Sequence, residues 1–202
     1  MSQSPRTARR GYGMMKRLFD LLVATSFLIL TIPTFIVVMI AIKLDSPGPI
    51  FFPQIRLGRH GKPFRYLKFR TMVVNAPNIG TFAIYKLRED QRISRIGRLL
   101  RKTAIDELPV LLNVLRGDMS IVGPRPALPL EADHYSELQR RRLELKPGVT
   151  GYWQVFGRQA GSYDFQRMVE MDLEYADKQS IFLDLKILLY TFVLALRRKA
   201  AY

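Results

Sequence analysis

Hydrophobic residues dominate positions 18–44, where the apolar run is interrupted only by Asp20, small polar residues, Pro33 and Lys43. A stretch of this length can span a bilayer, since about 20 apolar residues suffice. No small-residue cleavage site follows the run, so a retained membrane segment is favoured over a signal peptide. Residues 1–13 are polar and basic without apolar periodicity, which predicts a flexible tail.

The flanks and middle of this apolar segment bear on its topology. Lys16 and Arg17 precede the apolar segment and Lys43 lies at its end, so the positive-inside rule predicts that both ends are cytoplasmic. Pro33 lies near the middle, where it removes a backbone hydrogen bond and favours a sharp kink. The pattern leaves two structures open: a re-entrant helix–break–helix over residues 14–45, and a single crossing helix with a proline kink.

The pattern after the membrane segment predicts a hairpin and then helices. Residues 50–57 and 64–72 are typical of two strands joined by a short glycine-containing turn. Residues 89–102 place apolar side chains at helical spacing opposite arginines, which predicts an amphipathic helix. Residues 110–115 continue as a short helix, either buried or apposed to the membrane, that ends at Gly117.

The last third of the chain is less regular. Residues 131–145 have a charged helical pattern, which predicts a helix with a supporting structural role. Residues 146–158 are expected to form a glycine-containing loop, with Trp153 packed beneath it. Residues 180–198 are mainly apolar but interrupted by charges, which favours an interfacial helix over a plain core helix. We therefore expect an α+β fold, mainly helical, with a catalytic domain over residues 46–202.

Composition narrows the chemistry. The 202 residues include no cysteine, which excludes disulfides, thiolate zinc sites and a cysteine nucleophile. The two histidines, His60 and His134, are too few for a typical zinc hydrolase and lie in no evident triad pattern. The formal net charge of +15 predicts an anionic partner: nucleic acid, an acidic membrane surface or a phosphorylated substrate. Composition does not choose among the three.

An adjacent carboxylate pair, Asp106 and Glu107, is embedded in basic sequence. It follows arginines spaced by three that end at Arg101, and it precedes a proline-stiffened turn that contains Arg125. Arginine guanidinium groups bind phosphate oxygens through paired hydrogen bonds. A carboxylate among such arginines can bind Mg²⁺ or attack phosphorus. Spacing alone also fits a solvated helix face with ordinary salt bridges. Pro109 places the pair near a helix boundary, which favours a site for diphosphate chemistry.

Four motifs then carry a family resemblance. They are KFRTM at residues 68–72, DELP at 106–109, NVLRGDMSIVGPRP at 113–126 and KPGVTGYWQVFGR at 146–158. In this order they resemble the bacterial sugar transferase family, and in particular its small monotopic phosphoglycosyl transferases. The likeness runs from about residue 16 to the C-terminal helix, nearly the whole chain.

The resemblance implies a reaction. A phosphosugar would move from a UDP-sugar to polyprenyl (undecaprenyl) phosphate, giving a polyprenyl-diphosphate-linked sugar and UMP, at the start of glycoconjugate assembly. Asp106 would attack the sugar-bearing phosphate and form a covalent phosphosugar intermediate. Mg²⁺ would neutralise the diphosphate, with Asp106 as its protein ligand. Glu107 would position groups or manage a proton on the acceptor phosphate.

The same resemblance assigns cationic partners. Arg101, Arg125 and Arg158 would grip the phosphates. Lys68 and Arg70 lie in the KFRTM motif, and at least one of them would support the substrate or the fold around it.

The family also favours the re-entrant topology, broken at Pro33, with both ends on the cytoplasmic face of a bacterial inner membrane. Membrane lipid is then a partner of the chain.

Two other classes of function use parts of this pattern. A nucleic-acid-binding protein would use the net charge, but the membrane segment and the carboxylates among the arginines argue against a nucleic-acid partner. An inactive membrane scaffold would need the apolar segment but not Asp106. The sugar, the pathway and the oligomeric state are not encoded in these motifs.

Overall fold

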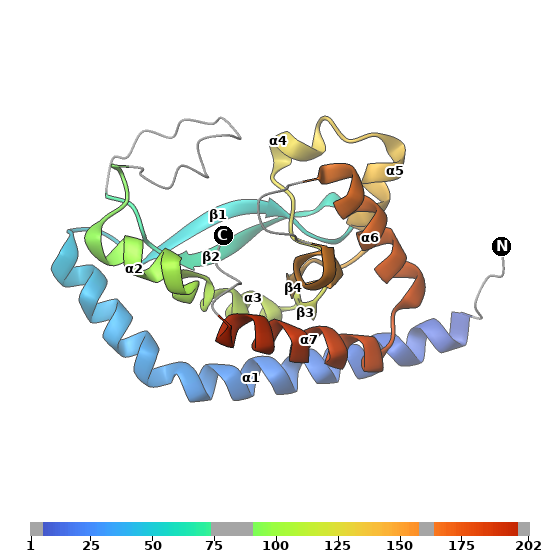
Figure 1. Ribbon diagram of the computed structural model, residues 1–202, viewed down its shortest axis with the longest axis horizontal. Coiled ribbons are helices and arrows are strands. Elements are labelled where there is room, and N and C mark those ends of the chain that lie inside the picture. Colours follow the sequence, from blue (N-terminus) through green and yellow to red (C-terminus); the bar gives the residue numbers. More distant parts are fainter. Residues whose placement is uncertain (1–5, 74–90, 158–163, 198–202) are drawn as a thin grey trace.

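The computed structural model describes residues 6–73, 91–157 and 164–197. A long helix, α1 (Arg6–Asp45), lies along one side of the molecule, and the remaining elements form an α+β domain above it (Figure 1). Two small two-stranded sheets are surrounded by short helices. This agrees with the mainly helical α+β class expected from the sequence.

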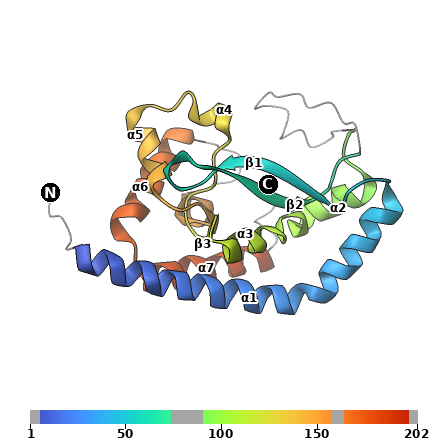
Figure 2. The ribbon, with the colours of Figure 1, turned by 180° about the vertical axis from the view of Figure 1, so that it is seen from behind.

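Helix α1 is continuous over its 40 residues, about 60 Å, and includes Pro33. It bends within its length instead of breaking into two helices, as Figures 1 and 2 show. The expected break is thus a bend, because a proline removes only one hydrogen bond from a long helix. The helix also starts at Arg6, inside the segment 1–13 that the sequence predicts as a tail. Once a helix is nucleated, adding arginines to its end costs little.

The first half of α1 is fastened to the domain by buried polar contacts. Asp20 is buried, and its Oδ1 accepts hydrogen bonds from the Ser120 hydroxyl at 2.9 Å and the Ile121 amide at 2.8 Å. Arg17 donates to the carbonyls of Val114 and Leu115. An arginine on the last carbonyls of a helix satisfies groups that have no partner within the helix.

The second half of α1 contacts the same domain from the other end. Val38 and Ile42 pack in a buried cluster with Phe69 and Leu100. Near its end, the Asp45 carboxylate accepts a hydrogen bond from the amide of Ile96 at 3.4 Å. Both ends of the long apolar helix therefore lie on one side of the same globular unit.

The first sheet is an antiparallel hairpin of β1 (Phe51–Leu57) and β2 (Pro63–Phe69), joined through the 3₁₀ turn η1 (Arg59–Gly61). Its register pairs Phe52 with Lys68, Gln54 with Tyr66 and Arg56 with Phe64. Residues directly opposite in an antiparallel pair share a face. The hairpin thus gathers four polar side chains on one face: Gln54, Arg56, Tyr66 and Lys68.

Helix α2 (Arg95–Thr103), the 3₁₀ turn η3 (Ile105–Glu107) and helix α3 (Val110–Arg116) follow one another closely. The sequence predicted the start of the first helix at residue 89. In the described part it starts after Ser94, whose hydroxyl accepts from the Gly97 amide and caps the end. Helix α3 ends as expected at Gly117, which adopts φ 90°.

A second sheet was not foreseen. Strands β3 (Ser120–Val122) and β4 (Gly148–Thr150) pair in parallel, so the start of the expected loop 146–158 is a strand. A Cβ on Gly148 would lie 2.1 Å from the backbone nitrogen of Gly123, and only glycine permits that approach. The π-helix η5 (Trp153–Gly157) follows, with Trp153 buried as predicted.

The predicted scaffold helix over residues 131–145 is divided into α4 (Pro129–Ala132), α5 (Glu137–Arg140) and the 3₁₀ turn η4 (Arg141–Glu144). Ser136 divides it, because its hydroxyl caps the amide of Gln139 and begins a new helix.

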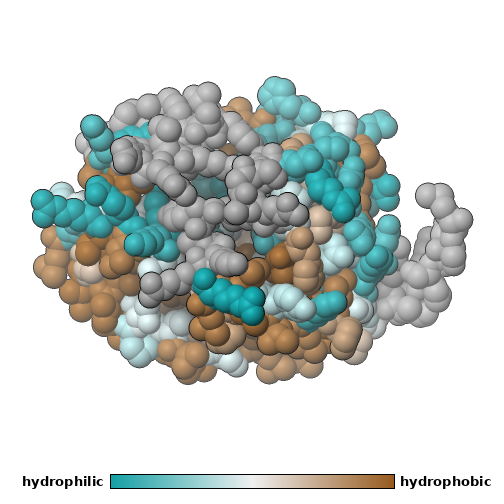
Figure 3. Space-filling view, viewed as in Figure 1, coloured by the Kyte–Doolittle hydropathy of each residue, from teal (hydrophilic) through white to brown (hydrophobic). Residues whose placement is uncertain are grey.

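Helices α6 (Phe165–Lys178) and α7 (Ile181–Leu196) close the described chain. Helix α7 lies beside α1, and large exposed apolar residues of the two helices form what we call the apolar face. Figure 3 shows hydrophobic colour along this side and hydrophilic colour above it. Its strongly exposed members include Leu22, Ile29, Leu30, Val37 and Leu44 on α1, and Phe182, Leu189 and Leu196 on α7. Helix α1 is long and apolar enough to cross a membrane. A continuous apolar surface of this kind fits contact with lipid.

Candidate active site

The carboxylate pair lies at the predicted helix boundary. Helix α2 ends at Ala104, which adopts φ 56° and ψ 14°, and η3 with Asp106 and Glu107 begins directly after it. The left-handed conformation is unfavourable for alanine, so backbone strain is stored one residue from the turn that holds the pair. Pro109 then caps the start of α3. The two carboxylates are thus held in a short turn between two helices.

Lys68 joins the hairpin to this turn. Its Nζ donates to Oε1 of Glu107 at 2.6 Å, and the two side chains are 19% and 31% exposed. Burial raises the pKa of the Glu107 carboxyl, but the charges of Lys68 and Arg125 outweigh it and hold the pKa at about 2. Glu107 is therefore ionised throughout the physiological pH range.

Asp106 has the opposite environment. It is 8% exposed, and it forms no ion pair within the described ranges 6–73, 91–157 and 164–197. Burial raises its pKa to about 6, with Lys68 lowering it and neighbouring Glu107 raising it further. Two adjacent carboxyls with pKa values this far apart are typical of functional sites, where one environment assigns each a different task.

Arg101 reaches the site from the last turn of α2. Its Nε donates to the hydroxyl of Thr71, which ends the KFRT segment, at 2.9 Å. Helix α2 can approach this segment because of Gly97, where a Cβ would lie 2.0 Å from the Thr71 carbonyl oxygen. Arg101 also lowers the pKa of Asp106 through its charge. The structure thus brings Arg101 and Asp106 together, as the sequence predicted.

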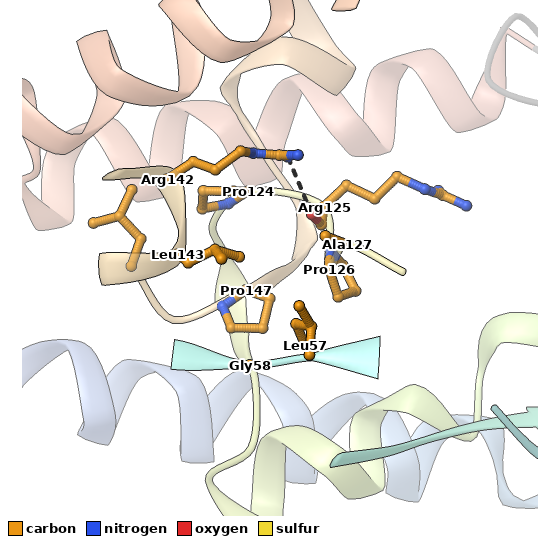
Figure 4. Close-up of a pocket in the computed structure, with 10 residues that line it drawn as sticks. Leu57, Gly58, Pro124, Arg125, Pro126, Ala127, Arg142, Leu143 and Pro147 are labelled. Atoms are coloured by element: carbon orange, nitrogen blue, oxygen red, sulfur yellow. Dashed lines mark hydrogen bonds between the residues drawn. The ribbon is translucent and has the colours of Figure 1, made fainter. Parts of the chain in front are cut away.

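Arg125 projects from the turn after β3 and is exposed. The turn is held from behind by Arg142, whose NH2 donates to the Arg125 carbonyl at 3.1 Å (Figure 4). Arg142 is in turn held by a buried ion pair with Asp172 at 2.8 Å and by the Tyr135 hydroxyl. In Figure 4 the Arg125 side chain points away from Arg142. Its charge lowers the pKa of Glu107, which places it on the side of the carboxylates.

The cavity beside this turn is not a substrate pocket. It measures about 10 Å³, room for one water molecule at most, and it is lined by Pro124, Leu143 and Pro147 among others. A sugar nucleotide cannot enter it.

Arg70 does not join this cluster. Arg70 is buried, and its guanidinium donates to the carbonyls of Pro47 and Ser46 at 2.7 Å and to the Ser46 hydroxyl. These groups form the turn after α1, so Arg70 supports the fold, one of the two roles that the sequence left open. Its predicted substrate contact gains no support from these bonds. Arg158 lies outside the described residues.

Sequence reasoning missed Arg56 and Tyr66. Arg56 is 9% exposed and lies on the same hairpin face as Lys68. The ring of Tyr66 has the Arg56 Cζ at 5.9 Å and the Lys68 Nζ at 5.3 Å from its centroid. A sequence signal for both residues was available. Side chains alternate between the two faces of a strand, so Tyr66 lies on the same face as Lys68, and the hairpin pairing places Arg56 on that face too.

Asn113, in the same motif as Arg125, has a structural role. It is fully buried, accepts from the Leu67 amide at 3.0 Å and donates to the Arg65 carbonyl at 2.7 Å. It thereby pairs with the backbone edge of β2 and fixes α3, and hence the carboxylate turn, against the hairpin.

Asp106 is the candidate protein ligand for Mg²⁺. Within the described residues, no group of three or more histidine, aspartate and glutamate side chains converges on one point. Mg²⁺ is commonly held by one or two carboxylates together with substrate phosphates and water. Asp106, a carboxylate without an ion-pair partner in the described chain, fits that mode of binding.

Known proteins share this chain's sequence over nearly its whole length. It is 46% identical over 178 residues to an uncharacterized sugar transferase of Bacillus subtilis, covering 88% of this chain and 85% of that protein. It is 36% identical to an exopolysaccharide production protein of Rhizobium meliloti, with 94% and 89% covered.

A third relative is longer. It is the UDP-glucose:undecaprenyl-phosphate glucose-1-phosphate transferase of Escherichia coli, 39% identical, with 94% of this chain but 42% of that protein covered. Several relatives are of this longer kind, so the chain spans less than half of their length. The profile of the bacterial sugar transferase family matches residues 11–198. The chain therefore belongs to the bacterial sugar transferase family.

Proposed function

We propose that this enzyme transfers a phosphosugar from a UDP-sugar to polyprenyl phosphate, in the first step of a glycoconjugate pathway. The observation that carries the proposal is the contrast between Asp106 and Glu107. Asp106 is buried without an ion pair in the described chain, while its neighbour is neutralised by Lys68. Relatives named as sugar-1-phosphate transferases on undecaprenyl phosphate support the substrate class.

The reaction proceeds in two displacements. A carboxylate oxygen of Asp106 attacks the sugar-bearing phosphorus, and the bond from that phosphorus to the bridging oxygen breaks, so UMP leaves with the electron pair. An oxygen of polyprenyl phosphate then attacks the same phosphorus and releases the Asp106 carboxylate. Splitting the transfer lets one site use a soluble donor and a membrane-bound acceptor in turn.

The pKa of about 6 suits Asp106 to this role. Above that pH it is ionised and can attack, yet it is less stabilised as an anion than an exposed aspartate, which makes it a better nucleophile. Arg101 and Arg125, one on each side of the carboxylate turn, would hold the two phosphates of the donor.

Glu107 acts by position and not by proton transfer. With a pKa of about 2 it is a poor base for an acceptor phosphate whose second pKa is about 6. Its ion pair instead fixes the Lys68 ammonium beside Asp106. Of the two roles that the sequence left to Glu107, the structure favours this one.

Mg²⁺ would be held by Asp106 and the donor's phosphate oxygens. When bound, it would neutralise charge on the diphosphate and help UMP to leave.

The apolar face supports a membrane location for the reaction. Both ends of α1 contact the same domain, through Asp20 at one end and Ile42 at the other. A helix that crossed a bilayer would have its ends on opposite sides, so these contacts support a re-entrant α1 that bends at Pro33 within the lipid. We place the domain on the cytoplasmic face of the inner membrane, where UDP-sugars and the acceptor headgroup meet.

The test is UMP release from a panel of UDP-sugars by the detergent-solubilised chain and by Asp106→Asn, with and without Mg²⁺ and polyprenyl phosphate. We expect release from one or a few sugars that requires both the metal and Asp106. A radiolabelled sugar should remain on the protein when the acceptor is omitted. If no sugar gives UMP above the Asp106→Asn background, the transferase proposal fails, and an inactive membrane scaffold becomes the better description.

A further inference from the structure

Arg56 is a buried cation behind the site. Its Nε and NH2 both donate to Oε1 of Gln54, at 3.1 and 2.9 Å, and its NH1 donates to the Pro126 carbonyl at 3.2 Å. All of these acceptors are neutral. Across residues 6–73, 91–157 and 164–197, Arg56 forms no ion pair with a carboxylate. A charge taken out of water without a counter-ion is costly, so its retention requires an explanation.

The contacts of Arg56 connect the two halves of the site. The Pro126 carbonyl belongs to the turn that carries Arg125, so Arg56 fixes that turn from the side of the hairpin. On its other side, the Tyr66 ring lies between the Arg56 guanidinium and the Lys68 ammonium. Lys68 then binds Glu107. A continuous series of contacts thus runs from the arginine turn to the carboxylate turn.

The charge of Arg56 also acts on its neighbours. Burial and the nearby charge of Arg125 lower the pKa of the Arg56 guanidinium, and the charge of Arg56 in turn helps to lower the pKa of Glu107. The carboxylate of Glu131 acts on Arg56 in the opposite sense. Four cations, Arg56, Lys68, Arg101 and Arg125, thus face three carboxylates here, those of Asp106, Glu107 and Glu131. The site is left with positive charge that a diphosphate group would neutralise.

We propose that Arg56 is a positioning residue that holds the Arg125 turn in place, and that its charge, which has no ion pair in the described part of the chain, strengthens binding of the donor's diphosphate. The inference rests on the proposed function and adds to it a residue that acts without touching substrate. The region that recognises the diphosphate then includes buried Arg56 as well as the arginines that contact it. The unfavourable free energy of burying the Arg56 charge is offset when the diphosphate binds.

Gln54→Glu tests the role of the charge with little change of shape. The new carboxylate would accept the same two hydrogen bonds from Arg56 and form an ion pair with it, so the arginine stays in place while its charge is neutralised. We expect UDP, used as a donor fragment in titration calorimetry, to bind about tenfold more weakly, an effect of the size expected for one charge at roughly 10 Å. The Tm should be unchanged or higher. Gln166→Glu on the exposed part of α6 is the matched control and should bind UDP like the wild type.

A second pair of variants separates the loss of the Arg56 charge from the loss of its hydrogen bonds. Both Arg56→Lys and Arg56→Gln lose the three hydrogen bonds of the guanidinium, but only the lysine keeps the positive charge. UDP should bind several-fold more tightly to Arg56→Lys than to Arg56→Gln. Equal affinity in this pair, or wild-type affinity in a stable Gln54→Glu, overturns the electrostatic role. A wild-type chain that binds no UDP at all would instead overturn the proposed function, so the two failures are distinguishable.

Discussion

The Nζ of Lys68 lies 2.6 Å from Oε1 of Glu107, and this contact separates the behaviour of two adjacent carboxyls. Glu107 has its pKa lowered to about 2, whereas that of Asp106 is raised to about 6. The two residues are adjacent in sequence, but the hairpin supplies an ion-pair partner to Glu107 alone. This difference is the basis for the proposal that Asp106 is the nucleophile and that Glu107 supports it.

Replacing Lys68 by glutamine should move the pH dependence of catalysis. The Lys68 charge lowers the pKa of Asp106, so its loss raises that pKa further above 6. Because Asp106 must be ionised to attack, the acidic limb of kcat/KM should shift upward by roughly one pH unit, together with a loss of rate. Lys62→Gln in the exposed hairpin turn is the charge-matched control. An unchanged acidic limb would contradict the role given to Asp106.

Asp106→Asn should stabilise the fold at neutral pH while abolishing activity. The native pKa of about 6 exceeds the ordinary value of 3.8, so the ionised carboxylate destabilises the native state above pH 6. Stability from this group is therefore gained as the pH falls from 6 to 4. At pH 7.5 the free energy of unfolding of the Asn variant should be higher by up to about 3 kcal/mol, which corresponds to a Tm higher by several degrees. Its advantage should disappear near pH 4, and a constant difference at all pH values would refute the linkage.

Arg70→Ala should lower stability and leave donor binding alone. It removes charged hydrogen bonds to the carbonyls of Ser46 and Pro47, which we expect to cost about 3 kcal/mol. Thermal unfolding should show a drop of several degrees, with KM for the donor within twofold of the wild type. Arg101→Ala should raise KM instead, and exposed Arg65→Ala should change neither quantity. A large KM effect in a stable Arg70 variant would restore its predicted substrate role.

The topology of α1 can be read by cysteine labelling, because the chain has no native cysteine. Met14→Cys and Lys62→Cys flank the apolar segment, and both positions are exposed. An impermeant maleimide should label neither in intact spheroplasts and both after permeabilisation. Leu30→Cys, in the middle of the apolar face, should stay unlabelled in the membrane. Labelling of Met14→Cys alone from outside would show a crossing helix.

The Arg142–Asp172 ion pair should be a main support of the Arg125 turn. Arg142→Ala leaves a buried carboxylate unpaired, which typically costs 3–5 kcal/mol, roughly 10 °C in Tm here. Adding Asp172→Asn removes that charge and should recover a part of the stability. It should not recover the activity, because the bond to the Arg125 carbonyl is still missing. Recovery of both would mean that the turn does not need Arg142.

Much of the local structure could be predicted because it depends on neighbours in sequence. The hairpin, the end of α3 at Gly117 and the boundary around Asp106 follow from turn residues and periodicity. The start of α2 was placed too early, because the pattern of apolar residues continues through Ser94 while the helix does not. The parallel pair of β3 and β4 was missed, since its strands are three residues long and distant in sequence.

By itself, the sequence determined the apolar segment, the cationic surplus, the carboxylate pair and, through the order of its motifs, the family. Only the tertiary structure decided that Lys68 binds Glu107, that Arg70 binds backbone instead, and that Arg56 lies buried behind Arg125. The reason is physical. The role of a charged side chain is set by burial and by partners tens of residues away, and neither is contained in its local pattern.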